Sequence, residues 1–207
     1  MKSPFAYDLY IFDMGNVVIK DIEVIDKIAS HYGFDLEQLQ LDYAHYAFPL
    51  MDGTIDSKLY WSHVAHQFGI MVQGDPLADF FDPNWNEPVV KIVDYVKSMG
   101  KRVVCGSNTY APHWGFLREK GFLDIFDKTY ASHEMGISKP FPQFFSCILE
   151  TECVKPEDAL FIDDYEENII TAKNMGLDTI QYAFDDSLIG FFNDLDSNHE
   201  IDSDSNR

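Results

Sequence analysis

The 207-residue chain is 46% hydrophobic and 15% aromatic, which is enough apolar material to bury a core, so a chain disordered throughout is excluded. Its 35 acidic and 15 basic residues give a formal net charge of −20 at pH 7. This balance opposes binding to a phosphate backbone, and no basic patch in the sequence offsets it locally, so we predict no nucleic-acid partner.

Two features of the chain predict its location. Cys105, Cys147 and Cys153 form an odd set with no CxxC spacing, which is typical of reduced thiols in the cytoplasm. Residues 7–18 include acidic side chains, unlike the apolar stretch of a signal peptide, and no apolar run approaches the ~18 residues of a membrane span. We predict a soluble cytoplasmic protein with no membrane partner, and the sequence indicates no oligomeric state.

Five short apolar segments predict buried strands, at residues 9–14, 102–107, 128–132, 159–164 and 179–183. Helices are predicted at residues 86–98, 111–120, 141–151 and 166–175, because glycine follows three of these segments and proline precedes the other. Such alternation is typical of an α/β fold, in which a doubly wound parallel sheet of the Rossmann type is built with right-handed crossovers.

The first crossover, residues 16–101, is far longer than the ~30 residues of a whole βαβ unit. Residues 22–81 carry apolar and aromatic positions at helical spacing, interrupted by the turn signals "YGFD", "MDGTID" and "QGDP". We therefore predict a small helical cap at residues 21–87, inserted after the first strand of a core made of residues 1–20 and 88–193. The polar, acidic residues 194–207 are predicted to form a disordered tail.

Polar side chains follow the predicted strands at the edge where an open parallel sheet binds ligands. They are Asp13 after the first strand, Ser107 and Asn108 after the second, Asp163 and Asp164 after the fourth, and Lys139 just before the helix at residues 141–151. Each alone is compatible with a structural role as a helix cap, a turn residue or a surface charge. The adjacent carboxylates are less ordinary, because they repel each other unless a cation, typically a hard divalent metal, compensates. Asn168 follows five residues after Asp163, where a first-turn helical side chain can reach back to this pair or can simply face solvent.

Taken together, these side chains supply the components of phosphoryl transfer through a covalent intermediate: a carboxylate nucleophile, hydroxyl and amide donors, a lysine countercharge and metal ligands. The motifs "IFDMGN", "VVCGSN", "SKP" and "FIDDYEEN" resemble, in order, those of the haloacid dehalogenase-like (HAD) hydrolase superfamily over residues 7–183. The insertion between the first two motifs is similar to the superfamily's arrangement with a cap after strand one. In detail, "FDMGNVV", "GSNT", "GISKP" and "FIDDYEENI" resemble the small bacterial sugar-phosphate phosphatases, which include α-D-glucose-1-phosphate phosphatase.

The resemblance implies a nucleophile and a metal site. Asp13 is expected to attack phosphorus and form an aspartyl phosphate. Mg²⁺ is expected to be bound by Asp13, the Gly15 carbonyl and Asp163, with Asp164 as a second ligand or as the partner of a metal-bound water.

The resemblance also implies how substrate is held. Ser107 and the Asn108 backbone are expected to bind the phosphate oxygens, and Lys139 is expected to offset the negative charge that the phosphate shares with the nucleophile. The expected function is that of a Mg²⁺-dependent phosphatase acting on a small phosphorylated metabolite of the sugar-phosphate class.

One component of the chemistry is missing from the sequence. Most phosphatases of the superfamily carry a second aspartate two residues after the nucleophile, as general acid and base, and this chain has Gly15 there. Such catalysis contributes about 10²- to 10⁴-fold in rate. Candidate substitutes are Asp21, on the way into the cap, and the cap histidines His45, His63 and His66.

Two other functions stay open on the sequence alone. A metal-independent haloacid dehalogenase would use the same nucleophile on carbon, but the adjacent carboxylates Asp163 and Asp164 would then have no cation to bind. A catalytically weak phosphate-binding or interaction protein that keeps the fold is favoured by Gly15, whereas retention of Asp13, Ser107 and Lys139 argues against it.

Overall fold

The central element is a five-stranded parallel sheet. The computed structural model of the chain describes residues 2–193, so the predicted tail at residues 194–207 lies outside the described residues. The strands are β1 (Leu9–Phe12), β4 (Arg102–Ser107), β5 (Lys128–Ala131), β6 (Ala159–Asp163) and β7 (Asp178–Gln181), in the order β5-β4-β1-β6-β7. All neighbouring pairs are parallel, which confirms the predicted fold class.

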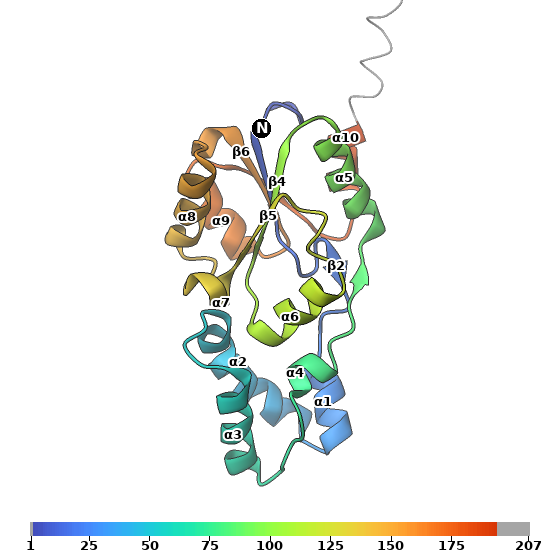
Figure 1. Ribbon diagram of the computed structural model, residues 1–207, viewed down its shortest axis with the longest axis vertical. Coiled ribbons are helices and arrows are strands. Elements are labelled where there is room, and N and C mark those ends of the chain that lie inside the picture. The colour runs from blue at the N-terminus through green and yellow to red at the C-terminus, as the bar shows by residue number, and fades with distance from the viewer. Residues whose placement is uncertain (1, 194–207) are drawn as a thin grey trace, which may run out of the picture.

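Helices cover both faces of this sheet (Figure 1). On one face lie α8 (Pro142–Glu152) and α9 (Glu166–Asn174), and the other face is covered by α5 (Glu87–Ser98), α6 (Ala111–Glu119) and α10 (Ser187–Asn193). Along β1 the side chains alternate between the two layers, since Tyr10 and Phe12 belong to one buried cluster and Leu9 and Ile11 to the other. Short helices α7 (Ser132–Met135) and a 3₁₀ turn at Pro156–Asp158 complete the core.

Four helices form a separate group beyond the carboxyl-terminal edge of the sheet, at the bottom of Figure 1. They are α1 (Ile25–Tyr32), α2 (Leu36–Met51), α3 (Ser57–Phe68) and α4 (Pro76–Asp79). Asp35 and Asp56 start α2 and α3 by accepting hydrogen bonds from the backbone N–H groups of Gln38 and Leu59. We call these four helices the cap; the boundaries predicted for it, residues 21–87, also take in its linkers and the first residue of α5.

Two short strands join the cap to the core. β2 (Ile19–Lys20) leads into the cap and pairs antiparallel with β3 (Asn84–Trp85), which leads out of it. Asn84 Nδ2 also donates a hydrogen bond to Asp21 Oδ2 at 3.0 Å. The outgoing and returning linkers are therefore held to each other, which the sequence did not predict.

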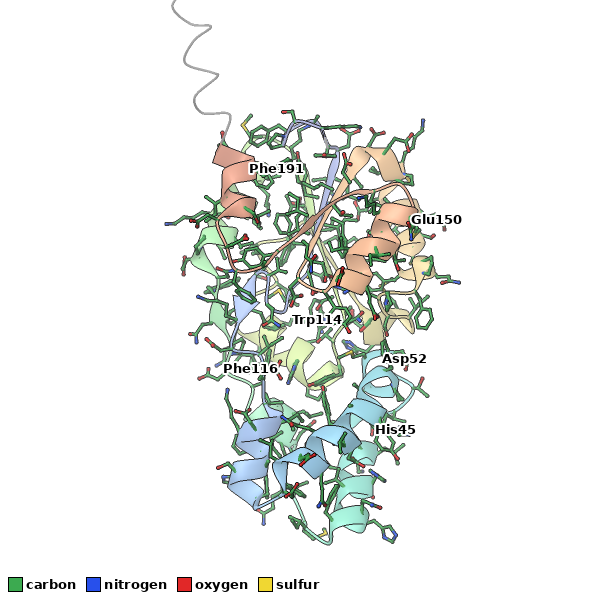
Figure 2. The ribbon with its side chains drawn as sticks, turned by 180° about the vertical axis from the view of Figure 1, so that it is seen from behind. His45, Asp52, Trp114, Phe116, Glu150 and Phe191 are labelled. Carbon is green, nitrogen blue, oxygen red and sulfur yellow. The ribbon has the colours of Figure 1, made fainter. Side chains whose placement is uncertain are left out.

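The cap contacts the core at the end of α2. Figure 2 shows Asp52 at the end of this helix that faces the core, and His45 farther from it. A Cβ atom on Gly53 would lie 2.8 Å from the backbone carbonyl oxygen of His133, and the hydroxyls of Tyr43 and Tyr110 are 3.1 Å apart. Within residues 2–193, helices long and apolar enough to cross a membrane are absent.

Candidate active site

Asp13 stands at the carboxyl end of the central strand. Its backbone N–H donates to the Ile162 carbonyl of β6 at 2.9 Å, and the Met14 N–H donates to Asp13 Oδ1 at 2.7 Å. Because β4, β1 and β6 are adjacent and parallel, their carboxyl ends bring Ser107, Asp13 and Asp163 to one edge of the sheet.

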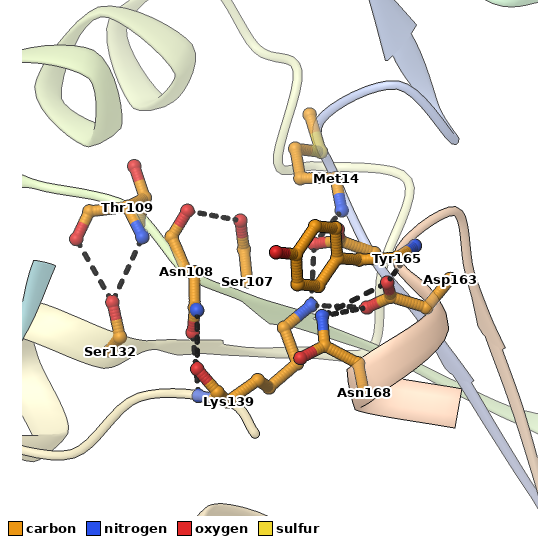
Figure 3. Close-up of polar contacts among 10 residues, drawn as sticks. Met14, Ser107, Asn108, Thr109, Ser132, Lys139, Asp163, Tyr165 and Asn168 are labelled. Carbon is orange, nitrogen blue, oxygen red and sulfur yellow. Dashed lines mark hydrogen bonds and ion pairs between the residues drawn. The ribbon is translucent and has the colours of Figure 1, made fainter. Parts of the chain in front are cut away.

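Lys139 is fully buried between two carboxylates. Its Nζ lies 2.9 Å from Asp13 Oδ1 and 2.6 Å from Asp163 Oδ2. The Asn108 side chain fixes the lysine backbone, since its Nδ2 donates to the Lys139 carbonyl and its Oδ1 accepts from the Lys139 N–H, both at 2.8 Å (Figure 3). From the sequence we expected only the backbone of Asn108 to take part, so this positioning function of its side chain was missed.

Asp163 is held by several donors at once. Tyr165 N–H donates to Oδ1 at 2.8 Å, and Asn168 Nδ2 contacts Oδ1 at 3.0 Å and Oδ2 at 3.1 Å, in addition to the lysine (Figure 3). Asn168 therefore does reach back to the acidic pair, and it is buried. Asp164 is half-buried and accepts a hydrogen bond from the Asn16 side chain.

The three carboxylates form a cluster suited to a cation. Ligand oxygens of Asp13, Asp163 and Asp164 all lie within 4.8 Å of one another. Burial raises the pKa of Asp13 to about 7, since the Lys139 charge only partly opposes the desolvation and Asp163 adds repulsion. Burial and the Asp163 charge also raise the pKa of Asp164. Three carboxylates against one ammonium leave the cluster negative, and carboxylate oxygens are the ligands that Mg²⁺ prefers, so these residues fit such an ion.

The carboxylates of Asp13 and Asp163 keep the Lys139 side chain charged. Burial by itself lowers the pKa of Lys139, but Asp13 and Asp163 outweigh it, so the net pKa is raised above its usual range. The lysine therefore stays an ammonium in this site.

Ser107 is buried at the end of β4, and within the described part of the chain its hydroxyl makes only a long contact of 3.5 Å with the Asn108 carbonyl. The loop behind it is fixed more firmly. Ser132 Oγ accepts from the Thr109 N–H at 2.9 Å and donates to the Thr109 carbonyl at 3.0 Å, which pins the loop to the end of β5 (Figure 3). A weakly bonded hydroxyl on a fixed loop can turn toward an incoming oxygen.

The candidate proton donors named from the sequence have other partners or surroundings in the described residues. Asp21 binds Asn84 at the linkers, and His63 Nε2 lies 2.8 Å from Asp42 Oδ1 within the cap. His66 lines a groove on α3 of the cap, and His45 is exposed on α2. Among residues 2–193, none of these four makes a hydrogen bond or an ion pair with Asp13.

Fold and site together define an α/β protein with an acidic site at the carboxyl ends of its parallel strands and an inserted helical group after the first strand. The haloacid dehalogenase-like hydrolase family matches residues 7–176, and the chain belongs to this family.

Known proteins resemble the chain over most of its length. A D-ribitol-5-phosphate phosphatase of Bacteroides thetaiotaomicron is 26% identical over 83% of this chain and 89% of its own. The crystal structure of the HAD family enzyme BT-2542 from the same species, in complex with magnesium and inorganic phosphate, has a TM-score of 0.75 at 24% identity, over 88% of this chain and 98% of that one. L-2-haloacid dehalogenase of Xanthobacter autotrophicus, with chloropropionic acid covalently bound, has a TM-score of 0.62 at 17% identity, over 92% and 83%.

Proposed function

We propose that the protein is a Mg²⁺-dependent phosphatase that hydrolyses a small phosphorylated metabolite of the sugar-phosphate class through an aspartyl-phosphate intermediate. The observation that carries the proposal is the buried Lys139 ammonium in contact with both Asp13 and Asp163, beside the third carboxylate Asp164. This arrangement places a nucleophile, a countercharge and metal ligands within one small site. The similarity to a D-ribitol-5-phosphate phosphatase supports the substrate class.

In the proposed reaction Asp13 is the nucleophile. Lys139 Nζ and the Met14 N–H both contact its Oδ1, so the carboxylate is fixed before substrate arrives. A carboxylate oxygen attacks phosphorus, the bond from phosphorus to the leaving oxygen breaks, and Lys139 offsets the charge shared by phosphate and nucleophile. The Ser107 hydroxyl and the Asn108 N–H donate to phosphate oxygens, and water then hydrolyses the aspartyl phosphate.

The metal ligands in this proposal are the carboxylates of Asp13, Asp163 and Asp164, with the Gly15 carbonyl. When bound, Mg²⁺ supplies Lewis-acid stabilisation of the phosphoryl oxygens and neutralises the acidic cluster. The carbon–halogen reaction has less support, because attack on carbon gives this cluster no cation to hold, and the likeness to L-2-haloacid dehalogenase concerns the fold.

The test is a screen of the purified protein for inorganic phosphate release. Substrates are D-ribitol 5-phosphate, α-D-glucose 1-phosphate, other sugar phosphates and p-nitrophenyl phosphate, each with Mg²⁺ and with EDTA. We expect turnover of at least one sugar or sugar-alcohol phosphate with Mg²⁺ and none with EDTA. Full activity in the chelator would overturn the metal requirement.

Two controls separate the alternatives. Chloride release from 2-chloropropionate without metal would assign the protein to the dehalogenases instead. Tight binding of inorganic phosphate without turnover of any ester would assign it to the phosphate-binding proteins, and the Asp13→Asn variant shows how much background activity a preparation carries.

A further inference from the structure

Gly15 borders the acidic cluster and has an ordinary backbone conformation. Its neighbour Met14 donates to Asp13 through the backbone, and its other neighbour Asn16 hydrogen-bonds Asp164 through the side chain. Gly15 is not among the glycines with positive φ, so the backbone itself admits any residue. A Cβ atom at this position would however lie 2.8 Å from Cδ1 of Ile22.

Ile22 is held in that place by the linkers to the cap. The residue before it, Asp21, has a φ of 63°, which turns the chain sharply. Asn84 of the returning strand β3 ties this turn through its hydrogen bond to Asp21 at 3.0 Å. Ile22 is half-buried and packs on the larger apolar cluster of the core.

We propose that Ile22 is a specificity-determining residue, which fills the space beside Gly15 and gives the nucleophile an apolar neighbour on the side facing the cap. This inference rests on the proposed function. In an in-line displacement the leaving oxygen departs on the side of phosphorus opposite to Asp13. The sheet lies behind Asp13, so that side is the cap side, and Ile22 stands on the linker that leads there.

The consequence concerns the class of phosphate ester. An isoleucine methyl group cannot donate a proton, so a leaving oxygen beside it departs as an anion. Esters of acidic hydroxyls, such as the anomeric hydroxyl of a sugar or a phenol, tolerate this, whereas esters of ordinary primary alcohols are slowed by the missing acid. The pair of Gly15 and Ile22 thus selects anomeric and similarly activated phosphates.

A double-mutant cycle of thermal stability tests the contact between position 15 and Ile22 without any assay of activity. Gly15→Ala is made in the natural chain and in an Ile22→Ala background, and thermal unfolding is followed in all four proteins. Because the added methyl meets Ile22 Cδ1, which must rotate away, we expect Gly15→Ala to lower Tm by about 2–4 °C in the natural chain. In the Ile22→Ala background it should lower Tm by less than half as much. Equal effects in the two backgrounds would overturn the contact.

A kinetic cycle tests the specificity. Gly15→Asp, Ile22→Ala and their combination are compared by single-turnover rates on D-ribitol 5-phosphate and p-nitrophenyl phosphate, so that only the chemical step is measured. The natural protein should favour p-nitrophenyl phosphate strongly. The double variant should gain at least about 10-fold on the ribitol ester relative to the aryl ester, and Gly15→Asp alone should gain less.

Gly15→Asn in the Ile22→Ala background is the matched control, because it has the size of aspartate without an acidic proton, and it should show no gain. Equal rates on both esters in the natural protein, or the same gain for Gly15→Asp in both backgrounds, would overturn the proposal. If no phosphate ester is turned over at all, the proposed function fails, while the stability cycle still decides the contact of Ile22 with Gly15.

Discussion

The contacts of Lys139 with Asp13 and Asp163 determine how mutation of each of these residues should affect stability and activity. Lys139 and Asp163 are fully buried and lie 2.6 Å apart, so removing either charge takes from the other its shortest ion pair. Asp13 and Asp164 differ from them, because burial and mutual repulsion raise the pKa of both carboxyls. Carboxyl groups whose ionised form is disfavoured by burial and by neighbouring charges are typical of functional sites.

Asp13→Asn should abolish turnover and keep the fold. The amide is nearly the same size but is a poor nucleophile, so we expect kcat to fall at least about 10³-fold. The change also removes a carboxylate whose ionised form burial disfavours, so Tm at pH 8 should be equal or higher. Activity is measured on the best substrate of the screen and Tm by circular dichroism, and substantial activity in the folded variant contradicts the covalent mechanism.

Asp163→Asn and Asp164→Asn should have different effects. Asp163 accepts from Lys139, Asn168 and the Tyr165 N–H, so replacing its carboxylate should cost about 1–3 kcal/mol of unfolding free energy, since Lys139 keeps its ion pair with Asp13. Asp164 has no ion pair among the described residues, so Asp164→Asn should leave stability nearly unchanged while weakening Mg²⁺ binding at least about 10-fold. Urea unfolding and titration calorimetry measure the two quantities, and equal changes in both variants contradict this division of roles.

At the scale of elements, α6 is joined to the segment that returns from the cap by a buried histidine. The His113 ring stacks on Phe81 with centroids 3.7 Å apart and planes 12° apart, and it hydrogen-bonds the Leu77 backbone. Its Nε2 is buried without a partner among the described residues. Burial lowers the pKa of His113 to about 3.

The lowered pKa of His113 predicts a loss of stability in acid. The unfolded chain binds the proton near pH 6.5 and the folded chain only near pH 3, so the contribution is complete above pH 6.5 and is lost as the pH falls toward 3. Between pH 7.5 and pH 4 the loss should be on the order of 3 kcal/mol. His113→Gln should remove this part of the pH dependence of urea unfolding, whereas His45→Gln, at an exposed position of α2, should retain it. Parallel pH profiles for the two variants count against this role.

The main strands could be predicted because buried strands of a parallel sheet appear in the sequence as short continuous apolar segments. β1, β4 and β6 are apolar on both faces, and Asp13, Ser107 and Asp163 come at their ends, so the topology alone brings these side chains together. The strands β2 and β3 are two residues long and have no period to detect. The contact of Ile22 with Gly15 depends on tertiary packing between segments, which no local pattern encodes.

At the scale of the whole molecule, the net charge and the site act in opposite directions on an anionic substrate. A chain with formal charge −20 repels a phosphate ester at long range. Attraction therefore has to come from close by, from Lys139 and a bound cation, and it is strongest when the cap excludes water from the site. We therefore expect the seating of the cap on the core to contribute to substrate recognition.

Gly53 provides a test of this seating, with Gly69 as its matched control. Gly53 lies just after α2 with a φ of 73°, and Gly69 ends α3 with a φ of 67°. Because both φ values are positive, alanine at either site should cost a similar free energy of about 1 kcal/mol in backbone strain. Their surroundings differ. A Cβ on Gly53 would lie 2.8 Å from the backbone carbonyl oxygen of His133, which cannot move as a side chain can, whereas a Cβ on Gly69 meets no atom within 4 Å.

We expect Gly53→Ala to push the end of α2 away from the core and Gly69→Ala to leave it seated. Both variants should lose a few degrees of Tm, and Gly53→Ala should lose more because of its clash, but only Gly53→Ala should lower kcat/KM on sugar phosphates, by about 10-fold or more, because a displaced cap no longer closes the site. Acetyl phosphate, which is too small to need the cap, should be affected less. Hydrogen exchange of residues 50–56 should quicken in Gly53→Ala alone. If the two variants lose kcat/KM equally, the contact between Gly53 and His133 affects stability alone and the predicted role of cap seating in recognition is wrong.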